Sequence, residues 1–338
     1  MRSTPEISVV VPVYGCGDCL RALHERLRNS VVEVTPAFEL IFVDDCSPDG
    51  AWEVLAELTE RFPEVRAFGL SRNFGQDAAI TAGLSMARGR WTVVLDCDLQ
   101  EPPEAIPRLY AKAQEGYDIV RTLRSRRGHS RRRRWASRGY RRIFHASDSG
   151  REYSNMSMLS RPVVDAFLSL RDRDREYALV LDWLGFRHTA VTIDFSERAS
   201  GESSYTFKHL VAVAFAGMFF QTTILLRVVV FVGFIIALLG VGLAAFNVYD
   251  YSIGHQPTGY TSLAVLLLVL TGFIIISVGV VGLYVGRIFE QVKQRPLFIV
   301  SRQAGISDEE LEGASSVEGR LVAPSGSSTE AAPSESSP

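Results

Sequence analysis

The stretch FELIFVDD at residues 38–45 decides the fold. It is an almost unbroken apolar run, which is typical of a strand buried on both faces, and it ends in Asp44 and Asp45. Further runs of this kind are ISVVVPVY (7–14), VRAFGL (65–70), WTVVLDCD (91–98) and YDIV (117–120). Helical patterns lie between them at residues 19–32, 51–61, 76–87 and 104–115. The alternation predicts an α/β fold with a doubly wound, mostly parallel sheet.

The composition limits the class of protein. The chain has 338 residues, of which 47% are hydrophobic and 22% are charged, with a formal net charge of -2. This length allows about two domains, and the apolar content excludes wholesale disorder. A near-neutral charge gives no general case for nucleic acid as a partner.

Four cysteines lie in the first hundred residues: Cys16, Cys19, Cys46 and Cys97. The first residues have a single arginine and no long apolar run before Pro12, so we expect no secretory signal peptide and reduced thiols in a cytosolic compartment. A zinc site is the alternative, but no second C-x-x-C motif or histidine cluster accompanies Cys16 and Cys19.

Two later stretches, residues 228–248 and 263–285, are apolar, uncharged and long enough to span a bilayer. Arg227 precedes the first, basic residues follow the second, and the connection between them has no Lys or Arg. The positive-inside rule therefore predicts a hairpin in the cytoplasmic membrane with both chain ends in the cytoplasm. Two buried core helices are the alternative.

These patterns divide the chain into four regions. We expect a cytoplasmic α/β domain over residues 1–206, a juxtamembrane amphipathic helix over 207–223 and the hairpin over 224–290. A packed helix is the alternative for the second region. Residues 303–338 are rich in Ser, Glu, Ala, Gly and Pro, which predicts a disordered tail.

Acidic residues stand where two of the expected strands end. Asp44 and Asp45 end one strand, and Asp96 and Asp98 end another, with Gln100 close behind. The carboxyl ends of parallel strands share one edge of a sheet, so these carboxylates should lie together there and repel one another. A doubly wound sheet binds its ligands at this edge. Oxygen ligands of this kind suit Mg²⁺ or Mn²⁺, which in turn binds a diphosphate. The alternative role, strongest for Asp45, is to cap the following helix.

No glycine-rich phosphate loop of either common type is present, so a bound nucleotide would have its phosphates held by a metal and basic residues. The blocks VVPVY (10–14), FVDDCSPDG (42–50), LSRNFGQDAAITAGL (70–84) and LDCDLQEPPE (95–104) resemble the signature blocks of family 2 glycosyltransferases. With the two apolar stretches behind them, the chain is similar to the polyprenyl-phosphate glycosyltransferases of the dolichol-phosphate mannose synthase type.

The resemblance implies a GT-A domain that moves a sugar, with inversion, from a nucleotide diphosphate sugar to a membrane polyprenyl phosphate. It implies a homo-oligomer, a tetramer by family analogy. Other membrane lipid or glycan acceptors, and a non-catalytic sugar-nucleotide-binding scaffold, are the alternatives. The implied nucleotide-sugar site comprises Pro12, Val13, Tyr14, Asp44, Asp45, Arg72, Asn73, Asp96, Cys97 and Asp98.

The resemblance also implies roles for acidic and basic residues. Asp96, Asp98 and Gln100 would hold the metal, and Asp96, Asp98 and Arg124 would carry the catalysis. The residues expected to contact the lipid phosphate or the diphosphate are Arg124, Arg134, Arg138, Arg198, Tyr205 and Lys208.

The chain departs from the family in the block at residues 152–157, and also at Ala178 and Ser204, where the family usually has an arginine and a lysine. Where relatives carry a frequently proposed catalytic Asp, this chain has Asn155, and Glu152 and Asn155 become the candidates for sugar recognition. A polyprenyl phosphate has a second pKa near ~6, so its oxygen is largely anionic at neutral pH. A general base is therefore not required of the enzyme.

The segment from Arg121 to Arg142 contains eleven arginines. Its position before the expected acceptor side favours attraction to an anionic leaflet and to a lipid phosphate. A nucleic-acid patch and a solvated basic face are the alternatives, and the lack of a recognised module argues against nucleic acid.

Overall fold

A computed structural model describes residues 4–124, 153–170, 172, 175–194, 224–253, 260–293, 295–306 and 320–321. It divides the chain into two compact units. The first consists of Met1–Gly201 together with Arg295–Pro338, and the second is Glu202–Gln294. The first unit therefore contains residues from both ends of the chain.

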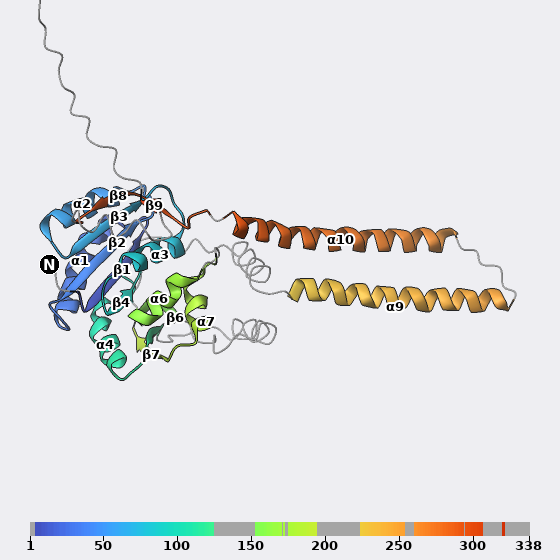
Figure 1. The fold of residues 1–338 in the computed structure, drawn as a ribbon, viewed down its shortest axis with the longest axis horizontal. Helices are drawn as coiled ribbons and strands as arrows, with labels where there is room; N and C mark the ends of the chain where they lie inside the picture. Colours follow the sequence, from blue (N-terminus) through green and yellow to red (C-terminus); the bar gives the residue numbers. More distant parts are fainter. Residues whose placement is uncertain are drawn as a thin grey trace, which may run out of the picture. The chain divides into compact units, whose positions relative to one another are not determined.

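A mixed sheet forms the centre of the first unit (Figure 1). Among the described residues its order is β7-β5-β6-β4-β1-β2-β3-β8-β9. The bounds are β1 Ile7–Val13, β2 Phe38–Asp44, β3 Val65–Leu70, β4 Trp91–Val94, β5 Ile119–Arg124, β6 Tyr153–Ser160, β7 His188–Ile193, β8 Ile299–Ala304 and β9 Arg320–Leu321.

The strand directions bring several chain segments to one edge of this sheet. β1 pairs in parallel with β2 and β4, and β2 with β3, whereas β6 runs antiparallel to both β4 and β5. β7 is parallel to β5, and β8 is antiparallel to β3. The carboxyl ends of β1 to β5 therefore share an edge with the amino end of β6.

Helices cover both faces of the sheet, which confirms the predicted doubly wound α/β class. One core cluster includes residues of α1, α2 and α4, and the other includes residues of α3, α6 and α7. The bounds are η1 Gly17–Cys19, α1 Leu20–Val32, α2 Ala51–Arg61, α3 Gln76–Met86, η2 Pro103–Ala105, α4 Ile106–Gln114, α6 Arg161–Ser169 and α7 Tyr177–Leu184. α3 lies so close to β1 that a Cβ atom on Gly83 would come within 2.2 Å of Val10 Cγ1.

Several predicted boundaries differ from the structure: the strand expected at residues 117–120 is β5 at Ile119–Arg124, and the helix expected at 104–115 is α4 at Ile106–Gln114. β4 ends at Val94 rather than at residue 98, and the residues beyond it lead into a turn after which Leu99 has a positive φ of 59°. Residues 303 and 304 belong to β8 and residues 320 and 321 form β9, although all four were expected in the disordered tail. The strands from β6 onward were not predicted, since residues 153–160 and 299–304 lack the apolar runs of the first five.

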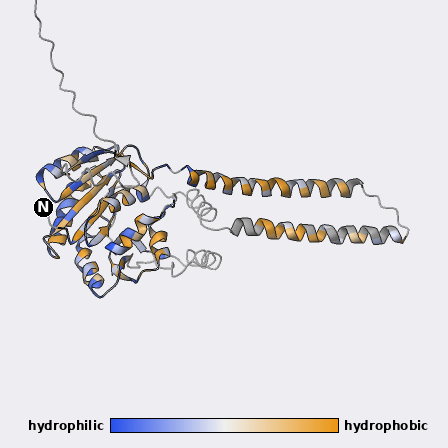
Figure 2. Cartoon of the chain, viewed as in Figure 1, coloured by the Kyte–Doolittle hydropathy of each residue, from blue (hydrophilic) through white to orange (hydrophobic). Residues whose placement is uncertain are grey.

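The second unit contains two helices that run side by side, α9 Ile224–Ser252 and α10 Tyr260–Val292 (Figure 1). Their described turns are mostly coloured hydrophobic in Figure 2. A Cβ atom on Gly233 would lie 2.7 Å from the Phe273 ring, so this glycine lets the helices approach closely. Within the described residues, no helix combines the length and the apolar character required of a membrane span.

A buried ion cluster links the first three strands of the sheet. Glu39 of β2 is 3% exposed and accepts a hydrogen bond from Ser8 Oγ at 2.6 Å. Its other oxygen lies 3.0 Å from Arg66 Nη1 and 2.8 Å from Arg88 Nη2. Removing the carboxylate leaves the buried Arg66 guanidinium without this anionic partner.

We predict that Glu39→Ala lowers the free energy of unfolding by about 3–5 kcal/mol, because it removes the carboxylate of the buried Glu39–Arg66 ion pair and leaves the guanidinium buried. Chemical denaturation of the full chain in detergent measures the change. The matched control is Glu115→Ala, which removes a solvent-exposed partner of Lys112 and should leave stability nearly unchanged. Equal stability of the two variants would contradict this assignment.

Candidate active site

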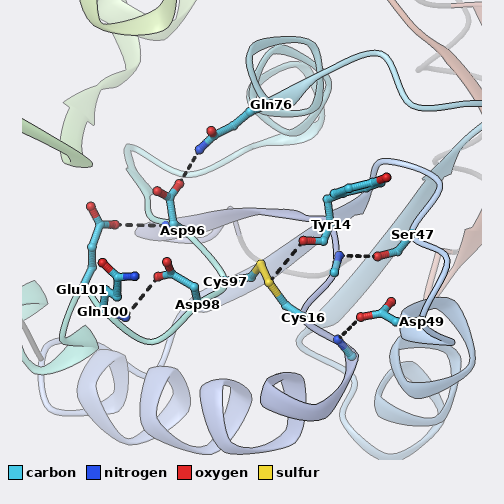
Figure 3. Close-up of a disulfide and its surroundings, with 12 residues drawn as sticks. Tyr14, Cys16, Ser47, Asp49, Gln76, Asp96, Cys97, Asp98, Gln100 and Glu101 are labelled. Carbon is cyan, nitrogen blue, oxygen red and sulfur yellow. Dashed lines mark hydrogen bonds between the residues drawn. A yellow bond between two sulfur atoms is a disulfide. The ribbon is translucent and has the colours of Figure 1, made fainter. Parts of the chain in front are cut away.

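The loop after β4 carries the acidic centre of the site (Figure 3). Asp96 Oδ1 accepts a hydrogen bond of 2.6 Å from the side-chain amide of Gln76, the first residue of α3. Asp96 Oδ2 accepts a second, of 3.0 Å, from the Asn155 amide of β6. Side-chain amides from α3 and from β6 therefore fix the orientation of this carboxylate.

Glu101 joins the same loop to β6. Its side chain is buried, and Oε2 accepts a hydrogen bond of 3.0 Å from the Asp96 backbone N–H. Its other oxygen accepts from the Met156 N–H at 3.1 Å and from the Ser154 hydroxyl. Sequence reasoning missed Glu101, although it lies in the acidic block that contains Asp96 and Asp98.

Crowding of carboxylates dominates the electrostatics of this loop. Burial, followed by the nearby Glu101 charge, raises the pKa of Asp96 from 3.8 to about 7, against the effect of the Asn155 and Gln76 amides. Burial also raises the pKa of Glu101. A bound cation would favour the ionised forms of these groups.

The donor set fits a hard divalent cation in its chemistry. Asp96, Asp98 and Gln100 offer only oxygen ligands, and all three side chains are half-buried rather than sealed from solvent. Asp98 Oδ1 accepts a hydrogen bond from the Gln100 backbone N–H at 3.1 Å, which brings these two residues together. As the described side chains stand, no group of three or more His, Cys, Asp or Glu residues is arranged to hold a metal ion.

The two acids at the end of β2 have different roles. Asp45 accepts hydrogen bonds from the Phe74 N–H at 2.7 Å and the Gly75 N–H at 2.8 Å, directly before α3. Both oxygens of Asp45 are thus engaged with the backbone of the loop before α3, and neither α2 nor α3 has a side-chain cap hydrogen bond at its amino end. Asp44 is fully buried and accepts from the Ser47 N–H at 2.9 Å, and burial raises its pKa.

The loop after β1 is tied to the loop after β2. Ser47 Oγ accepts from the Gly15 N–H at 2.6 Å, and Asp49 Oδ2 accepts from the Gly17 N–H at 2.7 Å (Figure 3). Tyr14 is 54% exposed here, which leaves its ring face open to a planar ligand. Pro12 and Val13 are buried, so Val13 can meet a nucleotide only through its backbone.

Arg72 and Asn73, both expected to contact the nucleotide, lie in the loop between β3 and α3. The Arg72 guanidinium is 4.1 Å from the centre of the Phe74 ring, and its Nη1 donates to the Asn73 carbonyl at 3.1 Å. Both residues are exposed. Cation–π stacking thus holds Arg72 in place while leaving it accessible to solvent.

A disulfide joins Cys16 to Cys97, with their Cα atoms 6.2 Å apart. The expectation of four reduced thiols is therefore wrong for this pair, whereas Cys19 and Cys46 are free. Cys16 follows β1 and Cys97 follows β4, and these strands are neighbours, so their ends meet. The bond connects the Tyr14 loop to the loop of Asp96 and Asp98, and it excludes a four-cysteine zinc site.

A family model described as Glycosyl transferase family 2 matches residues 8–174. The chain is similar to an uncharacterized glycosyltransferase of Synechocystis sp., with 34% identity over 91% of this chain and 99% of that protein. The chain belongs to glycosyltransferase family 2. As a family member it is a sugar-transferring enzyme.

Further relatives of this glycosyltransferase have more specific names. It is 36% identical to the undecaprenyl-phosphate 4-deoxy-4-formamido-L-arabinose transferase of Pseudomonas savastanoi pv. phaseolicola, over 90% of this chain and 92% of that one. Among solved structures, glucosyl-3-phosphoglycerate synthase from Mycobacterium tuberculosis in complex with Mn²⁺, UDP and phosphoglyceric acid is 18% identical with a TM-score of 0.48. That match covers 64% of this chain and 76% of that one.

Several residues predicted for the glycosyltransferase site lie outside the described residues. They are Arg134, Arg138, Glu152, Arg198, Tyr205 and Lys208. The backbone of Arg124 ends β5 opposite Ile193 of β7, at the same edge of the sheet as Asp96. Asn155, a predicted candidate for sugar recognition, donates its amide to Asp96.

We predict that the denatured glycosyltransferase, kept free of reductant, exposes two titratable thiols rather than four, because Cys16 and Cys97 are bonded. Thiol titration and peptide mapping measure this. Cys97→Ala should raise the count to three by freeing Cys16. Four thiols in the wild-type chain purified without reductant would contradict the bond.

We predict that Asp96→Asn reduces the pH dependence of stability. A carboxyl whose pKa is higher in the folded state than its ordinary value of 3.8 binds more protons when folded. Stability therefore falls as the pH rises between about 4 and about 7. Melting temperatures of both proteins in EDTA across this window measure the effect, and parallel curves would contradict it.

Proposed function

We propose that this enzyme transfers a sugar from a nucleotide diphosphate sugar to a polyprenyl phosphate of the undecaprenyl or decaprenyl type, at the cytoplasmic membrane face. The observation that carries the proposal is the loop of Asp96, Asp98 and Gln100, which lies beside the loops that follow β1 and β2. The acceptor is proposed from relatives whose names include undecaprenyl phosphate and whose similarity extends over about nine-tenths of the chain. The product would be a lipid-linked sugar for modification of cell-envelope glycans.

The donor site needs a divalent cation, Mg²⁺ or Mn²⁺, held by Asp96, Asp98 and Gln100. These residues would hold the cation, which would supply positive charge opposite the diphosphate leaving group. The amides of Gln76 and Asn155 fix the orientation of the Asp96 carboxylate. Tyr14 offers an exposed ring for the nucleobase.

The acceptor chemistry explains how Asn155 is compatible with activity. A phosphate oxygen that is already anionic needs placement in line with the anomeric carbon rather than deprotonation. An amide at this position cannot accept a proton as a carboxylate can, but it can hold Asp96. The arginine-rich segment, including Arg134 and Arg138, would attract the lipid phosphate, with Arg124, Arg198, Tyr205 and Lys208 as further contacts.

The membrane location belongs to the same proposal. Residues 228–248 and 263–285 would span the bilayer, with both chain ends in the cytoplasm and residues 207–223 along the interface. Large apolar side chains of both helices, among them Phe231, Phe234 and Ile275, are more than 60% exposed, which is the surface that lipid would cover. A homo-oligomer, a tetramer by family analogy, would share this surface.

We predict that Asp98→Asn lowers transfer about 100-fold or more, because the diphosphate charge loses its stabilisation. The assay uses the full chain in detergent with UDP- and GDP-sugars, undecaprenyl phosphate, and Mg²⁺ or Mn²⁺ against EDTA. The expected product is an organic-extractable glycolipid whose formation the chelator stops.

The matched control is Asp165→Asn, at an exposed acid of α6 paired only on the surface with Arg161. It should retain full activity. Full activity of Asp98→Asn would overturn the metal assignment. Binding of a nucleotide sugar without any lipid product would instead indicate another acceptor or a non-catalytic scaffold.

A further inference from the structure

The strand that follows α10 in the sequence is an integral part of the α/β unit. β8 pairs with β3, and the Ser71 N–H donates to the Ile299 carbonyl at 2.9 Å. Phe298 and Val300 are 1% and 2% exposed, so this segment contributes to the core. Residues far along the chain from the family's signature blocks therefore reach the carboxyl edge of the sheet.

One row of residues crosses three neighbouring strands at this edge. Asp44 of β2 is opposite Gly69 of β3, and Gly69 is opposite Arg302 of β8. Opposed residues of adjacent strands project from the same face of a sheet. Because Gly69 has no side chain, the Arg302 side chain crosses it and places Nη2 3.4 Å from Asp44 Oδ2. The Asp44 side chain is fully buried, whereas that of Arg302 is 43% exposed.

Trp52 and two glycines determine where the Arg302 side chain and β8 can lie. The Arg302 guanidinium is 4.7 Å from the Trp52 ring centre, which limits where it can swing. A Cβ atom on Gly69 would lie 3.1 Å from Trp52 Cζ3 and 3.2 Å from Arg302 Nε. At the end of β8, Gly305 has a φ of +76°, and a Cβ atom there would come within 2.4 Å of the Val65 carbonyl oxygen. Glycine at both positions thus permits β8 and Arg302 to lie where they do.

The partner of Arg302 lies at the expected nucleotide site. Asp44 accepts from the Ser47 N–H, and the Ser47 hydroxyl in turn holds the Gly15 N–H of the Tyr14 loop. Asp45 and Asp49 place further negative charge near Asp44, and Arg302 is the cation that opposes it. Burial raises the pKa of Asp44, while the Ser47 N–H and Arg302 act in the opposite direction.

We propose that Arg302 is a positioning residue of the donor site: through the buried Asp44 carboxylate, which accepts from the Ser47 N–H, it holds the Ser47 loop and the Tyr14 loop in place for the nucleoside of the sugar donor. This inference rests on the proposed function, because it assigns a ligand to the same sheet edge. It makes the segment after α10 a part of the donor site. Arg302 itself need not touch the nucleotide.

The test is titration of the full chain in detergent with UDP and with GDP, each in the presence of Mn²⁺. For the nucleotide that binds, Arg302→Gln should raise the dissociation constant about tenfold, since the buried Asp44 charge loses its partner. Arg302→Lys should restore part of the affinity. A double variant with Asp44→Asn should bind no more weakly than Asp44→Asn alone, because the two residues act through one contact.

A steady-state measurement separates positioning from structural damage. Arg302→Gln should raise KM for the sugar donor about tenfold while leaving kcat nearly unchanged. The matched control is Gln303→Ala, which alters the next residue of β8, on the other face of the sheet opposite Phe68. It should change neither constant.

The outcomes are distinguishable. If the wild-type chain binds neither UDP nor GDP, the proposed function itself fails and this inference fails with it. If the wild type binds but Arg302→Gln binds equally well while Asp44→Asn does not, only the role of Arg302 is overturned. If Gln303→Ala weakens binding as much as Arg302→Gln, β8 has a merely structural role and the positioning assignment is wrong.

Discussion

The constraint on which this structure depends is the gathering of partly desolvated carboxylates at one edge of the sheet. Parallel pairing of β1 with β2 and β4 places the acidic ends of β2 and β4 at the same edge, on either side of β1. Hydrogen bonds from N–H groups offset the cost of burying these carboxylates. Backbone N–H groups donate to Asp44, Asp45 and Glu101, and side-chain amides donate to Asp96. The remaining repulsion is what a cation and a diphosphate would relieve.

Asn155 shows how one substitution changes the part a position plays. A carboxylate there would add a further charge beside Asp96, whereas the amide donates a hydrogen bond to it. The site thereby gains rigidity around the metal loop and gives up a possible proton acceptor. An acceptor that arrives already ionised, as a phosphate monoester does at neutral pH, would not require that proton acceptor.

The sequence is informative about β1 to β5 because each buries both faces and so lacks polar alternation. It also predicted that Asp44 and Asp96 lie at the same edge of the sheet, since that follows from strand direction alone; each acid, however, interacts with the other acids of its own loop and not across β1. It could not place Asn155 against Asp96, because the contact depends on antiparallel pairing of β4 with a strand 59 residues further along. Arg302 was hidden for the same reason: β8 is short, follows two long apolar helices, and pairs with a strand more than two hundred residues earlier.

The interruption of the α/β unit by α9 and α10 bears on how the protein is made. Synthesis proceeds from the amino terminus, and domains fold as their residues become available. Until residues 299–304 leave the ribosome, β3 remains an open edge strand, a surface prone to unwanted pairing. The two apolar helices are synthesised before β8, so they leave the ribosome before β8 can pair with β3. β8 can therefore pair with β3 only late in synthesis. A chain that ended before it would keep every signature block of the family while leaving β3 at the edge of the sheet.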